Sequence, residues 1–308
     1  MESPMTTTRS IIDQLRPIGR PARVLYWGAA LWLASAVVHL VALAGDGWSW
    51  DGAVSFRKPL TFSLSIGLLL ATSGWILDRL PGRPRLSSVL AWTLLVSSTG
   101  EVGLITLQAW RGRASHFNTL QAGDAIVFAA MGAFVGVMSL CLVTLLVWSI
   151  VRRPSDPLVS LAIIAGMVLV TTGLGIGQWI IELGNDYVAS NGVVPETVVS
   201  GEAGVAKFPH AIAFHGVQLF IVTALVLRLG NLVEIARRRV MWLVVAGYTG
   251  LLVFASAQTI MGQTPLQPGG WTLGLTLSVI AVLVGAAFTV LGLRSRAPEY
   301  EETGAPVA

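Results

Sequence analysis

Eight long apolar stretches limit what this chain can fold into. Each has about 20 residues or more, the length that an α-helix needs to cross the roughly 30 Å hydrocarbon layer of a membrane. Within lipid, such a stretch can satisfy its backbone hydrogen bonds internally only as a helix. The sequence therefore predicts an all-α integral membrane protein with eight transmembrane helices, at 24–44, 59–77, 86–110, 125–151, 158–182, 210–230, 241–262 and 271–293.

The composition supports this class of protein. Of the 308 residues, 54% are hydrophobic and 12% are charged, whereas a soluble domain has about 25% charged residues. The net charge of +4 does not indicate nucleic-acid binding, because the basic residues follow the loops on one side of the membrane. The single cysteine, Cys141, lies in an apolar stretch, and we interpret it as a small buried hydrophobic residue.

The basic residues predict the orientation. Fifteen of the 20 Lys and Arg residues lie before the first span, after the last, or in and beside the even-numbered loops, including Arg228 at the end of the sixth span. Positively charged loops stay in the cytoplasm, so we expect both termini there. The segment 1–23 is then a cytoplasmic N-terminal segment, and 294–308 a disordered cytoplasmic tail. The other five basic residues, on the expected outer side, are Arg57, Lys58, Arg111, Arg113 and Lys207.

Polar and small residues recur at a spacing of 150. Gln108 is repeated as Gln258, and Pro59 as Pro209. The first span matches the fifth at a spacing of 139, which predicts an insertion of about 11 residues in the loop after residue 184. We infer two tandem, parallel four-helix units, 24–151 and 158–293, related by a two-fold axis along the membrane normal.

All four histidines fall on the expected outer side. We expect His39 and His215 to lie about 7–8 Å below the outer boundary at the helical rise of about 1.5 Å per residue. His210 lies at that boundary and His116 in an outer loop. These four residues are the candidate metal ligands, and His39 with His215 the candidate axial ligands of a haem. A transition metal such as copper or zinc would also suit neutral imidazole.

Further polar residues lie beside these histidines. Glu101 lies near mid-membrane, where a charge is costly, and its counterpart in the second unit is Leu251. Glu101 is therefore a candidate catalytic residue, with Arg111 and His116. The candidate substrate-binding residues are Gln108, Gln218 and Gln258.

Two basic segments open equivalent spans, Arg57-Lys58-Pro59 and Lys207-Phe208-Pro209. One interpretation is that Arg57, Lys58 and Lys207 reach toward lipid headgroups. The other is that they hold an anionic group of a cofactor or substrate, such as a carboxylate, a propionate or a lipid phosphate.

The span layout resembles that of haem A synthases, which also have eight spans, two tandem four-helix units and histidines toward the outer side. That resemblance implies haem chemistry. It covers the layout and no sequence motif, and those enzymes take their histidines in pairs from even-numbered helices. Here, His39 lies in the first span, His116 in the third loop, and His210 and His215 in the sixth span.

Two functional hypotheses follow for a multi-pass protein of the cell membrane. The first is a redox protein that depends on haem or another metal, with its site facing the extracytoplasmic side. The second is a transporter or receptor with a polar cavity between the two repeats and no cofactor. A membrane-embedded hydrolase or transferase and an accessory subunit remain alternatives, so enzymatic activity is left open. Besides the lipid bilayer, we expect an anionic small molecule or lipid as a partner. The residues expected to converge on one outward-opening pocket are His39, Glu101, Gln108, Arg111, His116, His210 and His215.

Overall fold

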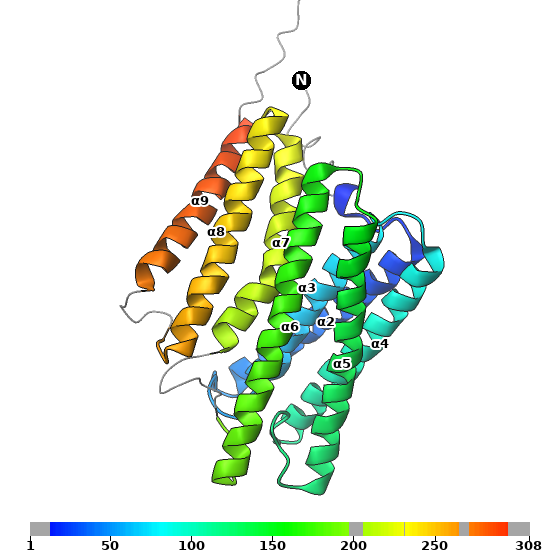
Figure 1. Ribbon diagram of the computed structural model, residues 1–308. Coiled ribbons are helices and arrows are strands. Elements are labelled where there is room, and N and C mark those ends of the chain that lie inside the picture. Colours follow the sequence, from blue (N-terminus) through cyan, green and yellow to red (C-terminus); the bar gives the residue numbers. More distant parts are fainter. Residues whose placement is uncertain (1–12, 197–205, 231, 265–270, 295–308) are drawn as a thin grey trace, which may run out of the picture.

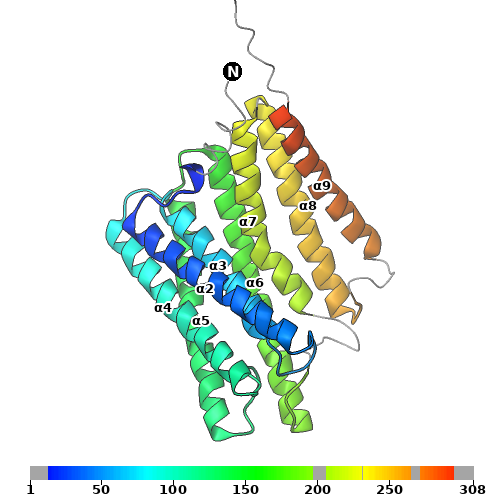
Figure 2. The same cartoon turned by 180° about the vertical axis from the view of Figure 1, so that it is seen from behind.

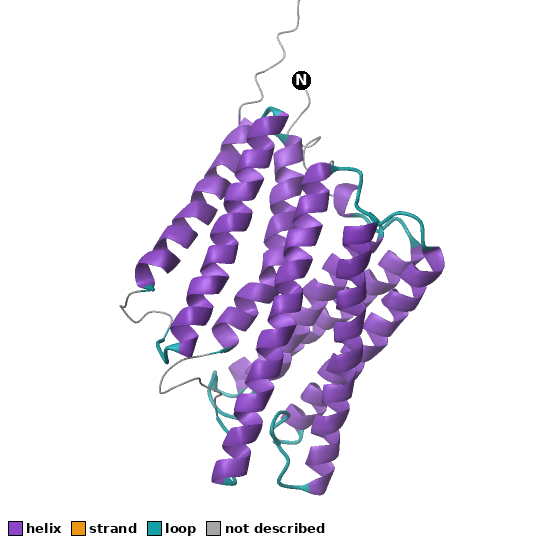
Figure 3. Cartoon of the chain, in the orientation of Figure 1, coloured by secondary structure: helices purple, strands orange, loops and turns teal. Residues whose placement is uncertain are grey.

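The computed structural model describes residues 13–196, 206–230, 232–264 and 271–294, which form helices and loops without strands (Figures 1 and 3). Its long helices are α2 (Arg20–Gly45), α3 (Arg57–Leu77), α4 (Pro84–Trp110), α5 (Ala122–Val151), α6 (Pro157–Asn191), α7 (Lys207–Leu229), α8 (Glu234–Ile260) and α9 (Thr272–Arg294). All eight are long and apolar enough to span a membrane, which confirms the predicted spans. The expectations for 1–12 and 295–308 fall outside the described residues.

The helices lie side by side in one bundle (Figure 1). Helices α7, α8 and α9 form one group and α2 to α5 the other, with α6 between them (Figures 1 and 2). Helix α2 begins and α9 ends at the same end of the bundle, which we call the termini end. The opposite end, with the connections α2–α3, α4–α5, α6–α7 and α8–α9, is the loop end. The charge distribution predicts that the loop end is extracytoplasmic.

Local sequence explains where several helices begin. Proline occupies the first turn of α2, α4 and α6, where its missing N–H is not needed and its fixed φ suits a helix. Before α6, the Asp156 carboxylate accepts hydrogen bonds from the backbone N–H groups of Leu158 and Val159. Asp156 also forms an ion pair of 3.1 Å with Arg228, so it ties the start of α6 to the end of α7.

Glycines allow the closest helix pairs. A Cβ on Gly67 or Gly74 of α3 would lie 3.2 Å from a backbone oxygen of α2. A Cβ on Gly166 of α6 would lie 2.6 Å from the Cα of Val217 in α7, and one on Gly173 would meet Phe214. Membrane helices associate through such close packing of small residues, so α2 with α3 and α6 with α7 are tightly packed pairs.

Helix α6 is longer than predicted. The sequence predicts a span of 158–182 and a loop after 184, but the helix continues to Asn191 and ends at Gly192, which has φ +68°. The prediction that the chain leaves the helix after residue 184 is wrong. Polar residues such as Asp186 end the apolar stretch, yet none of them breaks a helix, so α6 continues past the predicted span. Its 35 residues span about 52 Å at about 1.5 Å per residue.

Candidate functional site

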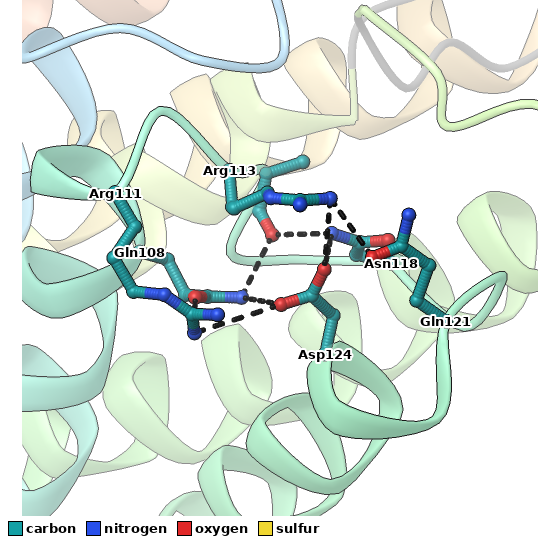
Figure 4. Close-up of polar contacts among 7 residues, drawn as sticks. Gln108, Arg111, Arg113, Asn118, Gln121 and Asp124 are labelled. Carbon is teal, nitrogen blue, oxygen red and sulfur yellow. Dashed lines mark hydrogen bonds and ion pairs between the residues drawn. The ribbon is translucent and has the colours of Figure 1, made fainter.

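A buried carboxylate holds the α4–α5 loop at the loop end (Figure 4). Asp124 lies in the first turn of α5 and is 3% exposed. Its Oδ1 accepts a hydrogen bond of 3.0 Å from Nε2 of Gln108, and its Oδ2 one of 3.1 Å from Nδ2 of Asn118. Arg111 and Arg113 each approach one carboxylate oxygen at 3.7 Å. The Asp124 carboxylate therefore binds residues from both ends of the α4–α5 loop.

Two of the predicted site residues belong to this network. Gln108 is fully buried at the end of α4, and its Oε1 accepts a hydrogen bond of 2.8 Å from Arg111. Asp124, which contacts both, was not among the residues predicted from the sequence. The signal available was an aspartate immediately before a predicted span, at a helix start, where the helix dipole favours a negative charge.

The same loop docks on the extension of α6. Phe117 has φ +60°, a conformation that non-glycine residues rarely adopt, and its ring is buried. The ring lies over Gly184, where a Cβ would be 2.2 Å from it. Phe117 and Val188 form a small apolar core with side chains of α5 and α6, separate from the main core. Packing against α6 therefore holds the strained residue in place.

His116 lies in this loop among aromatic rings. Its ring centroid is 5.4 Å from that of Phe62 in α3 and 6.2 Å from that of Phe128 in α5. Burial, together with the positive charges of Lys58 and Lys207, lowers the pKa of His116 from 6.5 to about 3. His116 is therefore neutral at neutral pH. In that state it can serve as a hydrogen-bonding group but carries no charge.

The positive charges beside His116 come from both halves of the bundle. Arg57 and Lys58 begin α3 and Lys207 begins α7. The three are half-buried, and they lie close enough for Arg57 and Lys207 to repel Lys58. Lys58 donates to the carbonyl of Ala53 at 2.8 Å and Arg57 to that of Trp50 at 2.7 Å. No carboxylate in the described ranges forms an ion pair with any of them. We call Arg57, Lys58 and Lys207 the basic cluster.

The other histidines lie within helices, and hydrogen bonds engage ring nitrogens of His39 and His210. His39 is 3% exposed. Its Nδ1 lies 2.8 Å from the carbonyl oxygen of Ser35, and its Nε2 accepts a hydrogen bond of 3.3 Å from the indole of Trp110. Nδ1 of His210 lies 2.9 Å from the carbonyl oxygen of Gly173. With both nitrogens engaged, His39 has no lone pair directed at a metal in this arrangement.

The remaining predicted residues are distributed over several places. Gln218 turns its amide onto the backbone carbonyls of Phe214 and His215. Gln258 is buried at the end of α8, and Glu101 is buried inside α4. Over the described ranges, no three His, Cys, Asp or Glu side chains come together in a way that could hold a metal ion.

An apolar groove lies between α2 and α4, away from these polar groups. It has a volume of about 550 Å³ and is lined by Trp27, Leu31, Trp92 and Val96, among others. Trp27, Leu31 and Trp92 are more than half exposed, which suits a surface that faces lipid.

Comparisons of the chain with models of protein families, with curated proteins and with solved structures found no match. The fold and its apolar surface therefore define only the class of protein, which is a multi-pass helical membrane protein.

Proposed function

We propose that the bundle consists of two tandem four-helix units. Equivalent helices begin 150 residues apart: α3 and α7 at Arg57 and Lys207, α4 and α8 at Pro84 and Glu234, α5 and α9 at Ala122 and Thr272. The turns that follow α4 and α8 also agree, with Gly112 at φ +63° and Gly262 at φ +71°. An experimental structure in which one rotation does not bring Gln108 onto Gln258 would refute the duplication.

We further propose that the loop end is extracytoplasmic, as the positive-inside rule predicts. In a Cys141→Ser background, a cysteine at Asn191 should react with a membrane-impermeant maleimide added to intact cells. A cysteine at Arg83, at the termini end, should react only after the cells are opened. Both positions are exposed, so burial does not limit the reaction. The reverse pattern would overturn the orientation.

For the function, we propose that the basic cluster binds an anionic group, a phosphate or carboxylate, where the two units meet. The observation that carries this proposal is the gathering of Arg57, Lys58 and Lys207 beside a neutral His116 with no carboxylate partner in the described ranges. Like charges held together in a partly buried place destabilise one another. A bound anion would relieve this repulsion and accept charge-assisted hydrogen bonds.

Such a site supports the transporter or receptor hypothesis more than the redox one. An anion held between two tandem units is placed where a relative movement of the units would act on it. The redox hypothesis needs His39 and His215 as ligands of a haem or transition metal. The hydrogen bonds at both nitrogens of His39 would first have to be broken. The geometry therefore favours an anion-binding transporter or receptor.

The test is direct binding of radiolabelled inorganic phosphate to the full-length protein in nanodiscs of neutral phosphatidylcholine. The wild type should bind phosphate saturably. The Lys58→Gln/Lys207→Gln variant should bind at least about tenfold more weakly, because a hydrogen bond to a charged group contributes about 1.5–3 kcal/mol. Arg83→Gln is the matched control, since it removes an exposed charge at the termini end.

A second arm distinguishes the source of the anion. In nanodiscs that contain phosphatidylglycerol, native mass spectrometry should reveal whether this lipid stays bound to the wild type and competes with free phosphate. Retained lipid, lost in the double variant, would identify a headgroup as the anion. If neither phosphate nor phosphatidylglycerol binds the wild type more tightly than the double variant, the proposal fails.

A further inference from the structure

Glu101 is a buried acid that the basic cluster does not explain. It lies in α4, nine residues before the end of the helix at Trp110, which places it about 13 Å from that end at about 1.5 Å per residue. The residue is 2% exposed, and its Oε2 is buried with no hydrogen-bond partner among the residues that the structure describes. A carboxylate at this depth costs several kcal/mol unless it is paired or protonated.

The helices that pack against α4 place no charge beside Glu101. These helices are α2, α3 and α5, and the titratable groups on them that are not exposed are Tyr26, His39, Arg57, Lys58, Asp124 and Cys141. The contacts of Gln108 with Asp124 and of Trp110 with His39 put both of these groups about two helical turns or more from Glu101. No residue in the described ranges forms an ion pair with Glu101, so the acid is expected to carry its proton at this depth.

A chain of polar side chains leads from the loop end toward the depth of Glu101. Trp110 donates to Nε2 of His39, and Nδ1 of His39 lies 3.2 Å from Oγ of Ser35. Ser35 in turn lies 3.2 Å from Oγ of the buried Ser63 of α3. Two contacts fix the register of α2 on α4: Gly28 lies beside Leu95 toward the termini end, and His39 beside Trp110 toward the loop end. Ser35 lies between these contacts, within about one helical turn of the depth of Glu101. Imidazole and hydroxyl groups can each accept and donate a proton.

We propose that Glu101 is a proton-binding site reached from the loop end through His39 and Ser35, and that its proton moves together with the anion held at the basic cluster. A proton from water binds the Glu101 carboxylate, which becomes a neutral acid. The same proton is released again to water after transport. One positive charge then accompanies each bound anionic group and lowers the cost of moving it through lipid. The anion that moves with the proton depends on the proposed anion binding. The protonation of Glu101 does not depend on it.

The acid itself is tested by labelling with dicyclohexylcarbodiimide, an apolar reagent that adds to protonated carboxyl groups inside membranes. In phosphatidylcholine nanodiscs at neutral pH, peptide mass spectrometry should find the adduct on Glu101. Glu101→Gln should remove it, and Glu182→Gln, which changes an exposed carboxylate of α6, should not. An unlabelled Glu101, or one labelled equally by a water-soluble carbodiimide, would overturn the proposal.

Coupling is tested with phosphate uptake into liposomes. A proton gradient directed inward should drive uptake by the wild type. Glu101→Gln should reduce that uptake about tenfold or more, as expected for loss of an intramembrane proton carrier, while phosphate binding stays unchanged. Gln matches the shape of a protonated Glu, so this variant should fold, and Glu101→Asp should restore labelling and part of the uptake.

The two proposals fail in different ways. If Glu101 is labelled but the wild type binds neither phosphate nor phosphatidylglycerol more tightly than Lys58→Gln/Lys207→Gln does, the anion site is wrong and the acid stands. If phosphate binds and its uptake in wild type and Glu101→Gln responds equally to the proton gradient, the coupling is overturned while the anion site stands.

Discussion

Gly166→Ala is expected to destabilise the bundle strongly, because α6 and α7 touch at this position. The added Cβ would lie 2.6 Å from Cα and 2.8 Å from Cβ of Val217. A backbone atom cannot rotate away as a side chain can, so the two helices must separate. Overpacking of this kind costs about 1–3 kcal/mol. The measurement is thermal unfolding in detergent, followed by size-exclusion chromatography of the heated protein.

Gly175→Ala is the matched control in the same helix. Gly175 is exposed, and an added Cβ there would meet nothing within 4 Å. Because alanine favours the helix more than glycine does, this variant should be as stable as the wild type or slightly more so. Equal loss of stability in the two variants would contradict the close α6–α7 packing.

Asp124→Asn is expected to release the α4–α5 loop. The carboxylate accepts hydrogen bonds from Gln108 and Asn118 and faces Arg111 and Arg113. Asparagine has one carbonyl oxygen, so its NH₂ group must face one of the two amide donors, and both guanidinium groups lose their negative partner. Protection of the loop amides at 113–119 from hydrogen exchange should fall about tenfold or more, since local opening governs exchange.

Loosening of this loop should also reach the anion site, because His116 lies in the loop beside Lys58 and Lys207. Phosphate binding should therefore weaken in Asp124→Asn. The control is Asp186→Asn, which removes an exposed carboxylate from the extension of α6. Unchanged exchange in Asp124→Asn would show that the packing of Phe117 on α6 holds the loop without the carboxylate.

Much of the fold is readable in the sequence because membrane spanning is a local property. Hydropathy summed over about 20 residues identifies a span, and proline at a helix start is visible directly, as at Pro84 and Pro157. The equivalent starts of α3 and α7 follow from the pairing of Arg57 with Lys207. The length of α6 was missed for the same reason, since a helix that leaves the membrane no longer needs apolar residues.

The site is less readable because it depends on how helices are rotated and at what height they meet. Gln108 and Arg111 were both among the predicted site residues and share a hydrogen bond, but Asp124, from the next helix, was not predicted. It placed four histidines on one side of the membrane. Only the packing decides that His116 meets the lysines of α3 and α7 while His39 bonds to Trp110.

Span number, helix starts and the uneven distribution of Lys and Arg are thus determined by the sequence alone, since each depends on residues close together in the chain. The tertiary structure decides which polar groups find partners. It satisfies Asp124 with four neighbours and, within the described ranges, leaves an oxygen of Glu101 without a hydrogen-bond partner. The physical reason is that a hydrogen bond or ion pair forms only within a few ångströms, and such distances between helices are set by the packing of all of them together.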